Sequence, residues 1–196
     1  IVGESGSGKS TIARTVMGLG KPSGGRLAVH AASVQMVFQD AVGSLNPRMT
    51  TRQTLAEVLK IKRNPQSPED LLARVGLSAA VLDQYPREMS GGQCQRVSIA
   101  RALACRPDVL VADEPVSALD VSVQARVLNI LRDLRKEMGL AILLIAHDLA
   151  VVKNVCDRIC VMQKGVFVDA GPAEQVFAHP ASDYTRRLLD AVPDVA

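Results

Sequence analysis

Tryptophan is absent from this chain of 196 residues, and aromatic residues make up only 3% of it. The hydrophobic core must therefore be aliphatic, built from Val, Leu, Ile, Ala and Met. Hydrophobic residues reach 47% and charged residues 22%, the ordinary mixture of a folded globular protein, which excludes a disordered or low-complexity chain. The length predicts one domain with room for a sub-domain.

Long apolar runs and a strong excess of charge are missing as well. The longest strongly apolar run, 140–146, has seven residues, whereas a membrane-spanning helix needs about 20. No N-terminal secretory pattern is visible, and the net charge of +3 is too balanced to indicate nucleic acid by itself. The cysteines form no C-x-x-C pair, which favours reduced thiols of a cytosolic protein over disulfides or metal ligands. They are Cys94, Cys105, Cys156 and Cys160.

Apolar periodicity predicts strands that alternate with helices. Continuous apolar runs at 34–38, 108–112 and 141–145 predict buried strands, and the apolar stripe of 122–138, ended by Gly139, predicts an amphipathic helix. Such alternation favours an α/β fold with a mostly parallel sheet flanked by helices. Further predictions are a helix over 9–19, a hairpin around Lys164 and Gly165, and a short helix over 182–191.

Residues 51–86 break this alternation. Their apolar residues fall at helical spacing, and Pro65 and Pro68 interrupt them. We therefore predict a helical sub-domain inserted into an α/β body.

The segment GESGSGKS, from Gly3 to Ser10, fits the pattern G-x-x-x-x-G-K-[ST]. Glycines let backbone N–H groups converge on phosphate oxygens, and the following helix N-terminus adds the positive end of its dipole. Lys9 can reach the β- and γ-phosphates, and the Ser10 hydroxyl can ligate Mg²⁺. The alternative, a plain Gly/Ser turn, is weak because this pattern rarely arises by chance. The predicted nucleotide-binding residues here are Gly3, Ser5, Gly6, Ser7, Gly8, Lys9, Ser10 and Thr11.

Further segments follow the phosphate loop in a fixed order. They are Gln39 after the strand 34–38, MSGGQCQR (89–96) opening an apolar helix, VLVADEP (109–115) ending a strand in two carboxylates, SALD (117–120), and IAHD (145–148). In this order they resemble the Walker A, Q-loop, signature, Walker B, D-loop and H-loop motifs of the ATP-binding subunit of ABC transporters. The resemblance covers nearly the whole chain. It implies an ABC ATPase domain of the P-loop NTPase fold, with ATP and Mg²⁺ as its cofactors.

Asp113 and Glu114 also carry a chemistry of their own. A carboxylate at the C-terminal end of a parallel strand lies where α/β sheets bind ligands. Asp113 can reach Mg²⁺ directly or through water, and Glu114 can accept a proton from the attacking water. Taken alone, the sequence Asp-Glu-Pro favours a solvated strand end that starts a turn. In a chain with a phosphate loop, the catalytic interpretation is favoured.

Gln39 and His147 each follow an apolar strand. The Gln39 amide can contact Mg²⁺ or the attacking water, and an uncharged group engages or withdraws at little cost, which suits a sensor. Without other motifs, Gln39 would be interpreted as a surface glutamine at a strand end, and a lone histidine there is more often a strand-end residue whose hydrogen bonds are satisfied. The resemblance makes His147 the switch residue that holds the γ-phosphate and orients Glu114 and water. We therefore predict Glu114, His147 and Gln39 as catalytic residues and Ser10, Gln39 and Asp113 as metal-binding residues.

Ser90 and Asp120 are both good helix N-caps, which is their structural explanation. Bare backbone at a helix start, as in the segment after Ser90, also makes an anion site. In the family this segment covers the γ-phosphate bound to the partner subunit. The resemblance therefore implies a head-to-tail dimer, of identical subunits or of paralogues, that encloses two ATP molecules. On this basis Ser90, Gly91, Gly92, Gln93 and Asp120 complete the predicted nucleotide-binding residues.

Two stretches indicate a branch of the family. DAVGSLNPRMT (40–50) and FAHPASDYTRRLLDAVP (177–193) resemble the di- and oligopeptide importers. The resemblance implies an energy-coupling ATPase for peptide uptake at the cytoplasmic face of the inner membrane. Its partners would be membrane permease subunits and, indirectly, an extracellular solute-binding protein, without nucleic acid. The alternatives are a soluble ABC-type ATPase that acts on nucleic acid or the ribosome, and a truncated nucleotide-binding remnant.

The predicted organisation is a single ABC ATPase domain over 1–196. It contains a helical sub-domain over 51–106, which includes the signature helix, and a short C-terminal extension over 171–196. The chain begins with Ile1 rather than Met, so we expect a fragment that lacks N-terminal strands and the aromatic ring that stacks on adenine in the family. Neither Tyr85 nor Tyr184 is placed to replace that ring. We therefore expect weaker ATP binding than in a full subunit.

Overall fold

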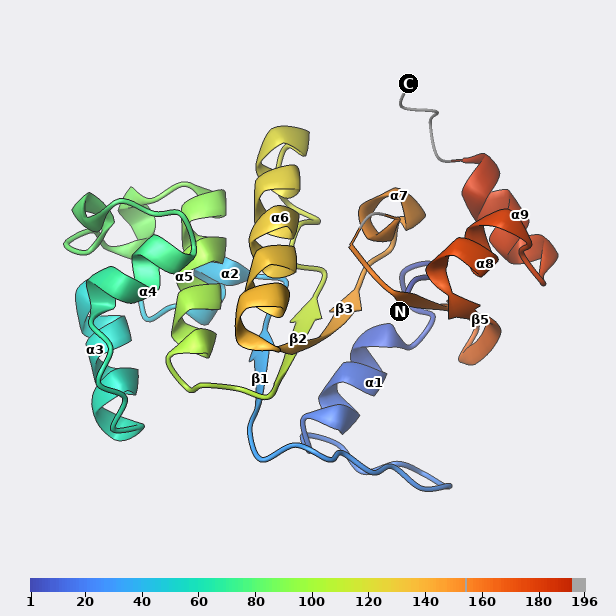
Figure 1. The fold of residues 1–196 in the computed structure, drawn as a ribbon, viewed down its shortest axis with the longest axis horizontal. Coiled ribbons are helices and arrows are strands. Elements are labelled where there is room, and N and C mark those ends of the chain that lie inside the picture. The colour runs from blue at the N-terminus through green and yellow to red at the C-terminus, as the bar shows by residue number, and fades with distance from the viewer. Residues whose placement is uncertain (154, 192–196) are drawn as a thin grey trace. The chain divides into compact units, whose positions relative to one another are not determined.

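The computed structural model describes residues 1–153 and 155–191. Residues 192–196 of the predicted C-terminal extension lie outside that part of the chain. The chain divides into two compact units, one formed by 1–29 with 143–196 and the other by 30–142. Figure 1 shows the elements in chain order: α1 (Lys9–Val16), β1 (Val34–Val37), α2 (Ala41–Ser44), α3 (Thr51–Ile61), α4 (Pro68–Arg74), the 3-10 turns η1 (Ala79–Val81) and η2 (Pro86–Glu88), α5 (Gly91–Leu103), β2 (Val109–Asp113), α6 (Val121–Met138), β3 (Ala141–Ile145), α7 (Leu149–Val152), β4 (Arg158–Gln163), β5 (Val166–Pro172), α8 (Ala173–Ala178) and α9 (Asp183–Asp190).

The first unit combines the first residues of the chain with its last part. Val2 bridges Ala146 on one side and Val161 on the other, both in parallel. Strands β4 and β5 form an antiparallel hairpin, and its turn places Lys164 at φ 48° and Gly165 at φ 86°. Two successive positive φ angles give a tight turn whose twist matches the flanking strands. Because the phosphate loop follows Val2 directly, it begins where the chain leaves a position that is paired on both sides.

The second unit is built on the parallel pair of β1 and β2. Residues 34–37 pair in register with 109–112, and the sheet order is β1-β2-β3. Ala141, the first residue of β3, donates its N–H to the Asp108 carbonyl at 3.0 Å. Strands paired in parallel end at the same edge, so residues 39 and 114, just beyond β1 and β2, leave the sheet on the same side.

Helix α6 follows the apolar stripe that the sequence predicts. Val127, Leu131 and Leu134 are its buried residues, spaced three and four apart on one face. Gly139 ends the helix at φ 64°, the left-handed position that glycine adopts without steric cost.

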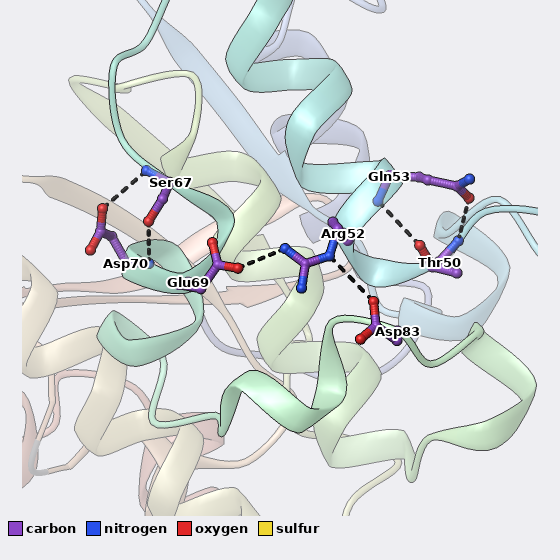
Figure 2. A network of polar contacts seen from close by, with 7 residues as sticks. All are labelled: Thr50, Arg52, Gln53, Ser67, Glu69, Asp70 and Asp83. Atoms are coloured by element: carbon purple, nitrogen blue, oxygen red, sulfur yellow. Dashed lines mark hydrogen bonds and ion pairs between the residues drawn. The ribbon is translucent and has the colours of Figure 1, made fainter.

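Figure 2 shows two of the capping boxes that begin helices in the region between β1 and β2, those of α3 and α4. The Thr50 hydroxyl accepts the N–H of Gln53 at 3.3 Å, and the Gln53 carbonyl oxygen accepts the N–H of Thr50 at 2.9 Å. Ser67 and Asp70 make the same reciprocal pair at 3.1 and 3.0 Å. Each box satisfies two N–H groups that a helix start would otherwise leave unpaired.

Arg52 joins α3 to two later segments on the surface (Figure 2). Its Nη1 donates to the Glu69 carboxylate at 2.6 Å and its Nε donates to Asp83 at 3.3 Å. The hydrogen bond from Arg52 is the main reason that the pKa of the Glu69 carboxyl lies below its ordinary value. These exposed contacts link the helices of this region.

The α/β fold with a parallel sheet and flanking helices confirms the predicted fold class. Strand β3 has the predicted bounds, whereas α1 ends three residues early, at Val16, with Gly18 at φ 73° just beyond it. Residues 51–106 contain α3, α4 and α5, but their boundaries as a sub-domain, like those of the single domain and the C-terminal extension, stay predictions. Within 1–153 and 155–191, no helix combines the length and the apolarity needed to cross a membrane.

Candidate functional site

The phosphate loop, residues 3–10, takes its shape from glycines. Gly6 at φ 80° and Gly8 at φ 104° lie in the left-handed region that other residues rarely enter. At Gly3, a Cβ atom would stand 2.1 Å from the carbonyl oxygen of Met162, so a larger residue fits only if backbone moves. The backbone path therefore requires glycine at these positions.

Lys9, the first residue of α1, is only 4% exposed. Its ammonium donates to the carbonyl oxygens of Gly3 at 2.6 Å and of Glu4 at 2.8 Å. A buried ammonium needs such acceptors. The first turn of α1 contains no acidic residue, so the helix dipole and the Lys9 charge together make a local field that favours phosphate.

The other predicted residues of the loop differ in exposure. Ser5, Gly6 and Thr11 are exposed, and Ser10 is half-buried in the first turn of α1. The Ser7 hydroxyl is buried and has no hydrogen-bond partner within the described part of the chain. An unsatisfied buried hydroxyl costs about 1–3 kcal/mol. Its presence fits a loop whose polar groups are completed by an anionic ligand.

His147 leaves the sheet at the same edge as the phosphate loop, within the first unit. Ala146 pairs in parallel with Val2, and the next residues are His147 and Gly3. His147 is exposed, and the Asp148 carboxylate beside it caps α7 by accepting the N–H of Ala150 at 2.8 Å. The structure thus places His147 near the start of the loop, while its role there stays a prediction.

In the second unit, Glu114 has an unusual backbone conformation. Its φ angle is 46°, which is rare for a residue other than glycine and is typical of strained positions at functional sites. Asp113 before it ends β2 and is 7% exposed. The Gln39 side-chain N–H group donates to the Glu114 carboxylate and to the Ser117 hydroxyl, each at 3.3 Å. The structure therefore brings two of the three predicted catalytic residues together.

Ser90 acts as the N-cap of α5. Its hydroxyl accepts the N–H of Gln93 at 3.2 Å, and the Gln93 side-chain oxygen accepts the N–H of Ser90 at 2.8 Å. At Gly92, a Cβ atom would stand 2.4 Å from the Val123 side chain, whereas at Gly91 the nearest contact is an ordinary 3.6 Å. Gly92 therefore lets α5 approach α6 closely, which is a packing reason for glycine there.

Asp120 acts as the N-cap of α6. Its carboxylate accepts the Ser122 hydroxyl at 2.7 Å and the Val123 N–H at 3.0 Å. These hydrogen bonds, that of Ser122 first, hold the pKa of the Asp120 carboxyl below its ordinary value. Both capping explanations therefore hold in the structure, and the nucleotide-binding roles of Ser90 and Asp120 stay predictions.

Sequence reasoning missed the support behind Gln39. Helix α2, which begins two residues after Gln39, is fastened to α5: the Arg101 guanidinium donates to the Ser44 carbonyl at 2.6 Å and to its hydroxyl at 3.4 Å. The Ser44 and Ser98 hydroxyls lie 3.1 Å apart in a further hydrogen bond. Burial lowers the pKa of Arg101. The sequence signal for this contact is an arginine within the apolar segment SIARAL, residues 98–103.

A cavity of about 320 Å³ lies beside Gln39 in the same unit. Gln95 of α5 lines it, is 2% exposed, and has a side-chain N–H group with no partner among residues 1–153 and 155–191. Gln39 and Asp40 also line the cavity, so polar and apolar groups share its wall, and nothing in the sequence pattern indicates it.

Comparisons with known proteins show what the chain is similar to in sequence. A family model described as ABC transporter matches residues 1–117. The oligopeptide transport ATP-binding protein OppF of Escherichia coli K12 is 45% identical over 215 residues, which cover 98% of this chain and 64% of that protein. The probable D,D-dipeptide transport ATP-binding protein DdpF of the same strain is 46% identical over 203 residues, which cover 100% of this chain and 66% of DdpF. The chain thus spans less than two thirds of the length of each.

Solved structures extend the likeness to the fold. The dimeric post-hydrolysis state of the ATP-binding cassette MJ0796, bound to ADP and Pi, superposes with a TM-score of 0.76 at 27% identity and covers 88% of this chain and 83% of that one. The cbiO1 protein from Clostridium perfringens, part of the ABC transporter complex cbiONQ, gives a TM-score of 0.77 at 29% identity, with 98% and 82% covered. Sequence and fold comparisons therefore agree.

Proposed function

This chain belongs to the ABC transporter family, and on that premise we propose that it is the ATP-hydrolysing, energy-coupling subunit of an importer for dipeptides or oligopeptides. The observation that carries the proposal is Glu114, a carboxylate on a strained backbone after a parallel strand and in contact with Gln39. The names of OppF and DdpF, both transport ATP-binding proteins for peptides, support the substrate class.

The phosphate loop binds the phosphates of ATP. The N–H groups of the loop and the start of α1 surround the anion, and the Lys9 ammonium exchanges the carbonyls of Gly3 and Glu4 for phosphate oxygens. Ser10, Gln39 and Asp113 offer the hard oxygen donors that Mg²⁺ prefers, and the ion, when bound, neutralises charge on the phosphate oxygens.

Glu114 acts as the general base that accepts a proton from the attacking water. The Gln39 N–H group donates to the same carboxylate at 3.3 Å, so Gln39 can restrain the base or release it at little energetic cost. His147 holds the γ-phosphate and orients the water. Positioned groups of this kind lower the barrier by stabilising the charge that develops on the transferring phosphoryl group.

A second ATPase subunit, identical or a paralogue, completes the nucleotide site. Ser90, Gly91, Gly92 and Gln93 cover the γ-phosphate bound to that partner, and Asp120 lies in the segment that crosses to it. The dimeric state of MJ0796 with ADP and Pi supports this arrangement. Closure of the dimer drives the permease subunits, with which the chain associates at the membrane.

Replacing Glu114 with Gln tests the catalytic part of the proposal. The change keeps the size of the side chain but removes the base, so ATP turnover should fall about 10²–10⁴-fold, the range typical of a general base. ATP affinity, measured by titration, should stay within about threefold because the phosphate loop is untouched. Glu57→Gln, on the exposed face of α3, is the control and should keep full turnover. Unchanged turnover in Glu114→Gln would contradict the proposal.

The same assay separates the importer from other ATPases. Turnover is measured alone, with peptide permease subunits reconstituted in lipid vesicles, and with DNA or RNA. Stimulation by the permease alone supports the importer. Stimulation by nucleic acid instead would overturn it in favour of an ATPase that acts on nucleic acid.

A further inference from the structure

A tyrosine from the far end of the chain holds the phosphate loop. The backbone N–H of Glu4 donates to the Tyr184 hydroxyl at 3.2 Å, across 180 positions of sequence. Tyr184 lies in α9 and is only 5% exposed, so packing fixes its ring and places its hydroxyl. The family model matches residues 1–117, so it includes Glu4 and ends before Tyr184.

Glu4 is bonded through both of its backbone groups. Its N–H donates to Tyr184, and its carbonyl accepts the Lys9 ammonium at 2.8 Å. Because one residue carries both bonds, the Tyr184 hydroxyl fixes the position of the group that holds the Lys9 ammonium.

The β4–β5 hairpin holds the loop at two further points. The Gly165 N–H donates to the Ser7 carbonyl at 3.0 Å, and the Met162 N–H donates to the Val2 carbonyl at 2.7 Å. Together with Tyr184, these contacts attach the segment 2–7 to residues of the C-terminal part of the chain. The loop is therefore positioned by groups far from it in sequence.

The start of α9 is itself fixed. The Ser182 hydroxyl caps the helix by accepting the Thr185 N–H at 3.0 Å, and Thr185 is fully buried. The Ala181 N–H donates to the Asp169 carboxylate of β5 at 2.7 Å. The start of α9, which carries Tyr184, is therefore hydrogen-bonded to the β4–β5 hairpin. This holds the Tyr184 hydroxyl in place where it accepts the Glu4 N–H.

We propose that Tyr184 is a positioning residue of the nucleotide site: its hydroxyl holds the Glu4 backbone, and with it the phosphate loop and the Lys9 ammonium, in the conformation that receives the phosphates. The inference rests on the proposed function, since it concerns the same loop. A loop held in its binding conformation loses less freedom when the ligand arrives, so affinity rises without any contact between Tyr184 and the nucleotide.

Replacing Tyr184 with Phe tests this role, because it keeps the ring and removes only the hydroxyl. The Kd values for ATP and ADP should rise together about 3–10-fold, the size of one lost hydrogen bond. The kcat should stay within about twofold because Glu114 is not affected. Hydrogen–deuterium exchange of the peptide covering residues 1–10 should accelerate. If Tyr184 had a purely structural role, Tyr184→Phe would lower the unfolding midpoint and leave both Kd values unchanged.

The chain offers a matched control in its other tyrosine. Tyr85 lies in the second unit, with the Arg87 guanidinium 5.5 Å from its ring centre. Tyr85→Phe should leave both Kd values and the exchange of residues 1–10 as in the wild type. A second variant, Asp169→Asn, weakens the acceptor that holds the start of α9 and keeps the Tyr184 hydroxyl. It should raise both Kd values in the same direction but by less.

The outcomes separate the two proposals. If the wild-type chain fails to bind ATP, the proposed function itself fails. If the wild type binds ATP while Tyr184→Phe and Asp169→Asn bind ATP and ADP equally well, with unchanged exchange in the loop, the positioning role is overturned and the proposed function stands.

Discussion

The phosphate loop and the Gln39–Glu114 pair are built in opposite ways. In the loop and just before it, backbone groups bond to other backbone groups: the Ser7 carbonyl accepts the Gly165 N–H at 3.0 Å, and the Val2 carbonyl accepts the Met162 N–H at 2.7 Å. In the pair, two side chains meet at 3.3 Å on an exposed surface. A backbone contact cannot be exchanged without moving the chain, whereas a long side-chain contact can be exchanged by rotation alone.

The difference matches the demands of the proposed reaction. A phosphate-binding loop binds more tightly when its conformation is already formed, because ordering the loop at the moment of binding lowers affinity. A sensor gains from contacts that are easily broken. We therefore expect substitutions in the loop to act on folding and binding, and substitutions around Gln39 to act on turnover.

The largest expected effect is that of Gly3→Ala. A Cβ atom at Gly3 would stand 2.1 Å from the Met162 carbonyl oxygen, and a backbone atom cannot turn aside as a side chain can. The free energy of unfolding should fall by about 2–4 kcal/mol, as for an overpacked buried site. ATP binding should be lost in the fraction that still folds. Chemical denaturation and nucleotide titration measure both effects.

Gly24→Ala is the control for this substitution. No atom lies within 4 Å of the Cβ position at Gly24, which also belongs to the first unit. Its stability should change by less than about 0.5 kcal/mol, the ordinary range of a surface substitution. If both alanine variants had wild-type stability and affinity, the backbone around Gly3 would be free to move and the phosphate loop would not be rigid.

Arg101→Met tests whether the contact between α5 and α2 supports the Gln39–Glu114 pair. The change leaves the Ser44 carbonyl without its 2.6 Å donor, so the free energy of unfolding should fall by about 1–3 kcal/mol. Because α2 follows Gln39 closely, turnover should fall more than ATP affinity. Exposed Arg14→Met of α1 is the control and should change neither property. A stable Arg101→Met variant with normal turnover would show that Gln39 needs no such support.

Local patterns made much of the fold predictable. Apolar runs gave β1, β2 and β3 within one residue at each end, and the stripe that ends at Gly139 gave α6. The pattern GESGSGKS predicted the phosphate loop because only glycine suits the φ angles of Gly6 and Gly8. Ser90 and Asp120 were predictable as caps because a capping hydrogen bond joins residues three apart.

Contacts between distant segments could not be predicted in the same way. Helix α2 has four residues, too few to show a period. The bond from Arg101 to Ser44 spans 57 positions and that from Glu4 to Tyr184 spans 180, and no spacing rule reaches so far. The positive φ angle of Glu114 also has no sequence signal, because the surrounding structure imposes it on an ordinary residue.

The smallest expected effect is that of Glu69→Gln, in a second exposed side-chain network. Both Arg52 and Glu69 are 45% exposed at their side chains, and exposed ion pairs contribute little to stability. The hydrogen bond from Arg52 lowers the folded-state pKa of Glu69 below its ordinary value of 4.5. Its contribution is therefore fully present above that value and is lost as the pH falls through the lowered pKa.

Urea denaturation of the wild type and Glu69→Gln at neutral pH, and again at a pH below the lowered folded-state pKa of Glu69, checks this dependence. The variant should be slightly less stable at neutral pH, and the difference should vanish in acid, where Glu69 is protonated in both states of the wild type. Glu57→Gln, which removes an exposed carboxylate from the same helix as Arg52, should show no such convergence. A large loss at neutral pH would mean that exposed side-chain contacts hold this protein as firmly as the backbone contacts of the loop.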